Sequence, residues 1–380
     1  MANWLSTMQQ TFEYYIVDPH TWKDVKRVES VLTSSINRDL NAETLGSASI
    51  TSTESLGECY IRIYLITIQN GVREKHPLGT FLIQTPSYSF DGKIKNITMD
   101  AYTPLLELKE NLPPLGYSIL KGEHVLDMAY RIVREQVRAP VAEITKAYGK
   151  QPVVGLGKVD SFLASDSTTL TRRELTFLQS NFIANIEETW ITFIYDLLEN
   201  AEYRLSLDEL GRVLFAPKQE LTTLQPVWTY DDSNSSILHP TLDMDYDLYG
   251  IPNVVEVIYS NGTEYYYGRA VNDDPSSPTS IPSRGREITK RVTDPSLLGN
   301  PSRDEVQIYA ERVLRELSTM EYTVSYTHGY CPVRIGDCVR LNYTRAGLNG
   351  VKAKVISQKI NCEPGCPVTE TATFTVDLWR

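Results

Sequence analysis

The stretch HPLGTFLIQTPSYSFDGKIKNITMDAYTPLLEL, residues 76–108, decides the fold that we expect for this chain. Two runs rich in β-branched and aromatic residues flank Asp91-Gly92, a dipeptide that tolerates positive φ in a tight hairpin. Just before it, YIRIYLITIQ (residues 60–69) alternates like a strand and is dense in Ile and Tyr. Short strands separated by turn signals favour a β-barrel or sandwich from Val31 to about Leu106.

The same signals return in the second half of the chain. NVVEVIYS (residues 253–260) and TEYYYGRAV (residues 263–271) flank Asn261-Gly262, the strongest short hairpin signal in the sequence. A Pro- and Ser-rich surface loop follows, NDDPSSPTSIPSRG (residues 272–285). The chain then ends in three more β segments: EYTVSYTHGYCPVRIGDCVRLNY, GVKAKVISQKI and TATFTVDLW.

Between the two β regions, the apolar spacing becomes helical. A helix is expected from Val125 to a stop at Pro140, a second from a capping box at Thr171, and a third over residues 190–201. YRLSL and RVLFAP (residues 203–217) then predict a hairpin that returns to a β layer.

The order β, helices, β, helix, β predicts an α+β protein with two antiparallel β-barrel domains and smaller accessory segments. We expect the first barrel over residues 1–115, completed by about 203–240, and a mainly helical insertion over 116–202. The second barrel spans residues 241–380 and contains an inserted helix, 302–318, whose capping box is Ser302 and Glu305.

Net charge and the distribution of apolar residues argue against some classes of partner and location. The net charge of −11 over 380 residues argues against a protein that grips phosphate backbones, because that affinity comes from Lys and Arg. The first residues lack a signal-peptide pattern, and no apolar run approaches the length of a membrane span. We therefore expect synthesis in a cytoplasm, with any later extracellular role reached inside a particle.

Three acidic residues, Asp243, Asp245 and Asp247, lie in the stretch DMDYDLYG. An EF-hand loop needs Gly at its sixth position and Glu at its twelfth, and this chain has Leu248 and Val254 there. A strand with acidic residues on one face is the better interpretation.

Four cysteines, Cys331, Cys338, Cys362 and Cys366, lie close together in sequence, and Cys59 stands alone. Four thiols suit zinc or an iron–sulfur cluster, and the Pro-Gly turn in CEPGC would bring two of them together. Two alternatives stay open: disulfides formed after release from the cell, and small buried thiols. Our main expectation is no metal and no cofactor.

The sequence contains no recognisable catalytic constellation. The five histidines are scattered, and none lies beside a nucleophile in an elbow such as G-x-S-x-G. We therefore expect a protein that is not an enzyme and has no catalytic residues.

Four stretches together resemble the baseplate hub or tail-tip proteins of tailed bacteriophages: PLGTFLI…DAYTPLLEL, VWTYDDSNSSI…NVVEVIYS, SPTSIPSRGREI and RIGDCVRL. The resemblance covers most of the chain, from about Thr33 to Arg380, and is weakest over residues 1–30 and about 140–185. It implies two barrels that each resemble a tail-tube subunit, so that three copies match a sixfold tube.

The resemblance implies a structural virion protein at the tail tip, made in the bacterial host cytoplasm. Its implied partners are itself as a homotrimer, the tail tube, the distal tail ring and tape measure proteins, and a central spike or fibre. DNA would pass through the ring without specific binding, and the net charge suggests an acidic wall.

Two other classes remain open. One is a tail-associated protein that binds or degrades glycans on the host surface, although degradation calls for a cleft with paired acids. The other is a tail-tube subunit, for which one barrel would suffice.

Overall fold

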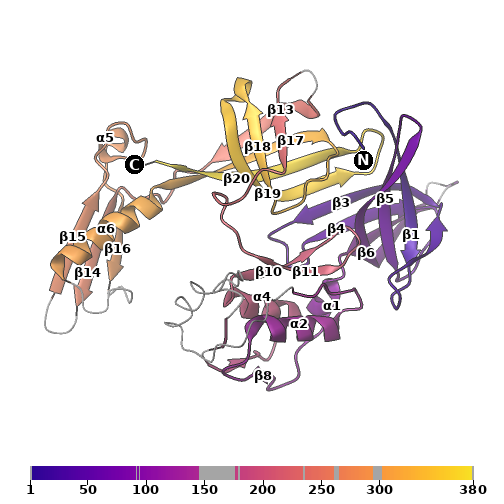
Figure 1. Cartoon of the computed structure of the whole chain (residues 1–380), viewed down its shortest axis with the longest axis horizontal. Coiled ribbons are helices and arrows are strands. Elements are labelled where there is room, and N and C mark those ends of the chain that lie inside the picture. The colour runs from indigo at the N-terminus through magenta and orange to yellow at the C-terminus, as the bar shows by residue number, and fades with distance from the viewer. Residues whose placement is uncertain are drawn as a thin grey trace, which may run out of the picture.

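The computed structural model describes residues 2–90, 92–93, 95–144, 176–178, 180–233, 236–260, 265–293 and 302–378. Strands account for 48 % and helices for 15 % of the structure, so the protein is mainly β. The α+β prediction is wrong, because the helical segments are short and the strands between them long. Figure 1 shows a large sheet, a helical unit against one side of it, and a small unit set apart at its far end.

The large sheet has 13 strands within the described residues. Its main order is β13-β17-β20-β19-β3-β4-β7-β6-β5-β1-β2, and β12 and β18 branch from β19. The first half of the chain supplies β1 (Gln9–Val17), β2 (Asp24–Val28), β3 (Val31–Asp39), β4 (Gly46–Ser52), β5 (Tyr60–Gln69), β6 (Val72–Phe90) and β7 (Lys95–Tyr102). The second half supplies β12 (Trp228–Asp231), β13 (Leu238–Tyr246), β17 (Thr319–Gly329), β18 (Cys338–Tyr343), β19 (Leu348–Asn361) and β20 (Pro367–Asp377).

The expectation of two closed β-barrels is also wrong. Strand β3 pairs antiparallel with β19, from Ser35↔Asn361 to Asp39↔Ser357, and this pairing joins the two halves of the chain. Over the described ranges the result is one open sheet and no closed barrel. The strand signals predicted the strands themselves, but they carry no information about which strand edges meet. The domain ranges expected from the sequence stay a prediction.

Each half of the sheet curls around its own hydrophobic core. The first core includes Ile36, Ile50 and Met99, and the second includes Val324 and Ala372, all essentially buried. The two cores lie on the same side of the joined sheet, since alternate residues of a strand point to opposite faces.

The helical unit contains α1 (Leu106–Glu110), α2 (Val125–Gln136), α4 (Trp190–Glu199), the short pair β8 (Ser118–Ile119) and β9 (Phe182–Ile183), and the hairpin β10 (Tyr203–Leu207) and β11 (Val213–Pro217). Helices α2 and α4 confirm the predicted periodicity, and β10–β11 confirms the predicted hairpin. Helix α2 ends before Pro140, because Val137 is already extended. The capping box predicted at Thr171 lies outside the described residues.

The small unit is a three-stranded sheet, β15 (Tyr265–Val271), β14 (Val254–Ser260) and β16 (Thr289–Thr293), covered on one face by α6 (Arg303–Leu317). The short helix α5 (Ile281–Arg284) lies in the connecting loop. The predicted capping box is confirmed, because the Ser302 hydroxyl accepts from the Glu305 amide and the Glu305 carboxylate accepts from the Ser302 amide. The helix packs closely on Gly268, where a Cβ would lie 2.7 Å from the carbonyl oxygen of Val306.

Strands β14 and β15 pair antiparallel, as the hairpin signal predicted, although Asn261-Gly262 lies outside the described residues. Strands β6 and β7 also pair as predicted, and Gly92 adopts the positive φ of 94° that the turn requires. Asp91 is not among the described residues. None of the helices described here is both long and apolar enough to cross a membrane.

Candidate functional site

The face of the large sheet opposite the two cores is lined by hydroxyl side chains. It runs over eight consecutive strands, β13-β17-β20-β19-β3-β4-β7-β6, drawn from both halves of the chain. The strand registers align its half-buried or exposed Ser and Thr residues: Thr33, Ser35, Ser47, Ser49, Thr51, Ser87, Ser89, Thr98, Thr319, Thr323, Ser325, Thr327, Ser357, Thr369, Thr371, Thr373 and Thr375. We call this surface the hydroxyl face.

Single rows of the hydroxyl face cross the junction between the two halves. One row runs through Thr327, Thr369, Lys359, Asn37 and Ser47 on five adjacent strands. Because a shift of one residue would turn every side chain to the other face, the β3–β19 register is what makes this face continuous.

Cross-strand hydrogen bonds satisfy many of these hydroxyls. Ser325 Oγ lies 3.1 Å from Thr371 Oγ1, and Thr51 Oγ1 lies 3.3 Å from Thr98 Oγ1. Such Thr–Thr and Thr–Ser pairs stabilise neighbouring strands.

Charged residues on the hydroxyl face are outnumbered by hydroxyl residues, and most of them are acidic. The acids at its outward-facing register positions are Asp39, Asp100, Asp243, Asp245, Glu321 and Asp377, and the lysines are Lys352, Lys354 and Lys359. The acidic stretch of β13 therefore forms the predicted strand, with Asp243 and Asp245 on one face. Asp247 follows the strand and accepts from the Tyr249 amide at 2.7 Å.

A buried polar network lies beneath the hydroxyl face, on the core side of the sheet. Glu370 accepts from the Tyr326 hydroxyl at 2.5 Å and from Gln358 Nε2 at 2.7 Å, and it lies 3.4 Å from His328 Nε2. His328 Nε2 in turn lies 3.1 Å from the hydroxyl of Tyr230. Glu370 and His328 are both fully buried, so the network has no access for a substrate and holds strands together instead.

The ionisation of His328 follows from these contacts. Burial alone would lower the pKa of its imidazole, but hydrogen bonds to Cys331 and Glu370 and the charge of Glu370 outweigh it and raise the pKa to about 10. Burial and the same carboxylate hold the pKa of Tyr326 well above its usual value. We infer that the His328 ring is protonated at neutral pH, with Nδ1 2.7 Å from the Gly329 carbonyl oxygen and Nε2 facing Glu370.

The structure does not bring the four C-terminal cysteines together. Cys331 belongs to the second core, with its sulfur 3.2 Å from the Tyr230 hydroxyl, and Cys338 begins β18. Cys362 and Cys366 lie in or against the first core, and burial raises the pKa of the Cys362 thiol to about 11. All five cysteines are free thiols.

The four thiols therefore do not form one convergent group. Zinc and iron–sulfur sites need convergent thiolates, whereas burial opposes ionisation of Cys362 and Cys366. In the part of the chain that the structure describes, no group of three or more His, Cys, Asp or Glu side chains is placed to hold a metal ion.

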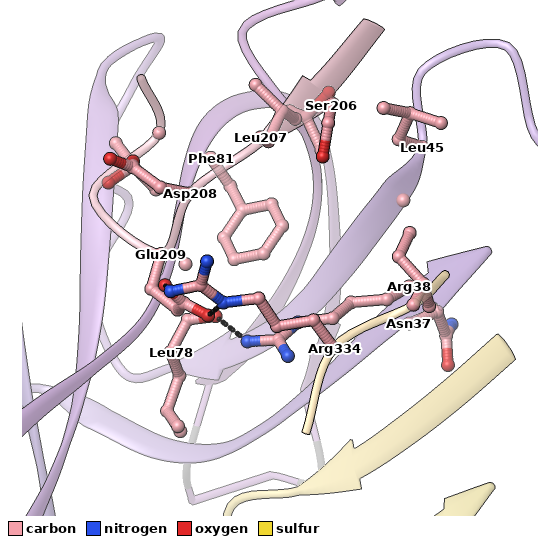
Figure 2. A pocket seen from close by; sticks show the side chains of 16 residues that line it. Asn37, Arg38, Leu45, Leu78, Phe81, Ser206, Leu207, Asp208, Glu209 and Arg334 are labelled. Atoms are coloured by element: carbon pink, nitrogen blue, oxygen red, sulfur yellow. Dashed lines mark hydrogen bonds and ion pairs between the residues drawn. The ribbon is translucent and has the colours of Figure 1, made fainter. Parts of the chain in front are cut away.

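A pocket lies where the helical unit meets both halves of the sheet (Figure 2). Its cavity of about 60 Å³ is lined by β3, the first part of β6, the β10–β11 loop and residues 334–335. The Arg334 guanidinium donates twice to the Glu209 carboxylate at 2.5 Å, and Arg38 donates to the Leu78 carbonyl at 2.6 Å. The lining contains no His or Cys. The ion pair between Arg334 and Glu209 connects the β10–β11 loop to the segment before β18, so we interpret the pocket as a structural contact between these segments.

Sequence reasoning missed both the pocket and the network, because their members lie far apart in the chain. Arg38 and Gln358, for example, are 320 residues apart and hydrogen bond at 3.1 Å. The hydroxyl face has one signal in the sequence, the alternation of Thr in TETATFTVD (residues 369–377). The sequence does not indicate which residues of other strands align with these Thr residues.

Comparison with known proteins identifies a shared fold. The chain is similar to a tail protein from Neisseria meningitidis MC58, with a TM-score of 0.57, 12 % identity, and coverage of 97 % of this chain and 98 % of that one. It is similar to the 43 kDa tail protein of prophage MuSo2 from Shewanella oneidensis, with a TM-score of 0.57, 10 % identity, and coverage of 96 % and 98 %. No protein-family model and no curated protein matches the sequence. At these identities the likeness establishes the fold.

Proposed function

We propose that this chain is a structural protein of a bacteriophage tail, without enzymatic activity. Its fold is similar to two tail proteins over nearly the full length of all three chains, which supports this class. More specifically, we propose a baseplate hub at the tail tip: a homotrimeric ring that joins the tail tube to a central spike or fibre. Distal tail ring and tape measure proteins would be its other neighbours.

The hydroxyl face is the observation that carries the proposal. A channel for DNA needs a wall that does not adsorb it, and affinity for DNA comes from Lys and Arg releasing counterions. The face offers Ser and Thr hydroxyls, and its lysines are outnumbered by acids. We propose that this face lines the channel, with a wall that is mainly hydroxyl instead of the mainly acidic wall suggested by net charge.

Native mass measurement and cryo-electron microscopy of the purified full-length chain test this proposal. We expect three copies per particle, with the hydroxyl face on the inner wall of the ring. A chain that stays monomeric at every concentration, or a ring whose inner wall is another surface, would contradict the proposal.

A charge variant tests the wall independently. Thr369→Lys places a cation from each copy on the proposed inner wall, and Ile308→Lys places one on the exposed side of α6. We expect the Thr369 variant to gain salt-sensitive DNA retention and the Ile308 variant to gain much less, because three lysines converge in a channel. Equal retention would argue against a channel wall at Thr369.

One observation favours a second candidate, a glycan-binding protein of the tail. The outer face of the small sheet presents Tyr265 and Tyr267 beside Arg269 and Arg291, and Glu256 accepts from Tyr267 at 3.0 Å. Exposed rings next to polar groups suit contact with sugars, whose faces are apolar and whose edges are hydroxylated. Binding to host cell-wall glycans that is lost in Tyr265→Ala would support it, and a glycan-release assay would test degradation.

A further inference from the structure

The hydroxyl face ends at two free strand edges. Strand β13 pairs with β17, and no other described strand lies along its outer side. At the opposite end, β5 pairs with β6 only along Val72–Leu82 of β6. Within the described chain, residues 84–90 of β6 therefore pair with β7 alone. Free edges present unpaired backbone N–H and C=O groups, which are a template for another strand.

The β6 edge has two chemically distinct faces. Ser87 lies opposite Thr98 and so belongs to the hydroxyl face, and Ser89 shares that side. Tyr88 and Phe90 point to the other side and are 73 % and 64 % exposed. Two large aromatic side chains thus stand in solvent on the side where the rest of the sheet packs its core.

The β13 edge repeats this division. Asp243 and Asp245 lie on the hydroxyl face, opposite Ser325 and Thr323. Met244 and Tyr246 point to the core side and are 37 % and 56 % exposed. The two edges therefore match face by face, with apolar side chains on the same side of each.

Strand direction also matches. Residues 84–90 carry no charge, so no acidic side chain there opposes the acidic β13. Adjacent strands of the eight are all antiparallel, so β6 and β13 run in opposite directions at the two ends. Identical copies placed head to tail would continue the antiparallel pattern, and a heterologous contact of this kind gives a ring when the rotation between copies closes.

We propose that β13 of one copy pairs antiparallel with residues 84–90 of β6 in a second copy. The pairing covers Tyr88 and Phe90 with Met244 and Tyr246, and it extends the hydroxyl face from copy to copy. This inference rests on the proposed ring and names the interface that closes it.

Cysteine cross-linking tests the pairing in the full chain. Ser87→Cys or Ser89→Cys is combined with Asp243→Cys or Asp245→Cys, and these combinations cover the neighbouring registers that keep the faces aligned. Within one copy the two edges lie at opposite ends of the eight-strand run, with six strands between them, so we expect a disulfide between them to join different copies. The matched control combines Ser89→Cys with Val25→Cys on β2, another exposed edge strand.

We expect most of the oxidised chain to run as covalent dimer and trimer for at least one β6–β13 combination, and to run as monomer for the control. Native mass and circular dichroism of the reduced variants verify assembly and folding. If the chain is trimeric but no β6–β13 combination cross-links, or only the control cross-links, the interface is wrong and the proposed ring still stands. If the unmodified chain, the β6–β13 variants and the control are all monomeric, both the interface and the proposed ring are wrong.

Discussion

Replacing Glu370 with Gln should destabilise the protein strongly, although the two side chains have nearly the same shape. The carboxylate is fully buried and receives a hydroxyl at 2.5 Å, an amide at 2.7 Å and the His328 ring at 3.4 Å. A Gln side chain has one carbonyl oxygen and one NH2 group in place of the two carboxylate oxygens. Its NH2 group must therefore face either the Tyr326 hydroxyl or the nitrogen donors of Gln358 and His328. Removing one partner of a buried charged pair costs about 3–5 kcal/mol, and we expect a loss in that range.

Urea unfolding followed by circular dichroism measures this loss. The control is Glu321→Gln on β17, whose side chain is exposed and which should change the free energy of unfolding by no more than about 0.5 kcal/mol. Adding His328→Gln to Glu370→Gln should restore part of the loss, because the unpaired buried cation is then removed. A change below about 1 kcal/mol for Glu370→Gln would refute the account of the network as a charged, stabilising cluster.

Three further results are expected. The pKa of His328 is raised to about 10 from an ordinary 6.5, so its protonated form stabilises the fold fully below pH 6.5 and less as pH rises through 10. The difference in free energy of unfolding between the unmodified chain and His328→Gln should therefore shrink from pH 6 to pH 10. A difference that grows over this range would contradict the reasoning. Gly268→Ala should loosen α6 from its sheet, seen as faster amide hydrogen exchange in the small unit, because the added Cβ would lie 2.7 Å from the Val306 carbonyl oxygen; unchanged exchange would show that the helix can shift without cost. Ser302→Ala should cost about 1 kcal/mol in the same unit by removing the N-cap, whereas Ser302→Asp should retain most of the stability.

Local structure was largely predictable from the sequence. Helices α2, α4 and α6 followed from apolar spacing, and the Ser302 cap followed from one Ser and one Glu at the right separation. These signals are local, since the residues that decide them lie within a turn or two of each other. The β6–β7 and β14–β15 hairpins were readable for the same reason.

The joining of strands was not predictable in the same way. Two separate barrels and one open sheet contain the same strands, and the difference lies in the β3–β19 pairing. The cysteines show the same limit. Cys331 and Cys362 are near in sequence, yet they pack in different cores on either side of the junction.

The β3–β19 junction has a consequence during synthesis. Arg38 meets Gln358 across it, so 320 residues must leave the ribosome before the first strand edge finds its neighbour. At about 5–20 residues per second, β3 waits roughly 16–64 s with one side open to other nascent chains. Because the edge of β3 stays open for this time, partly synthesised copies could associate through it too early. Assembly of the proposed ring through the large sheet can begin only after β19 has been synthesised and has paired with β3.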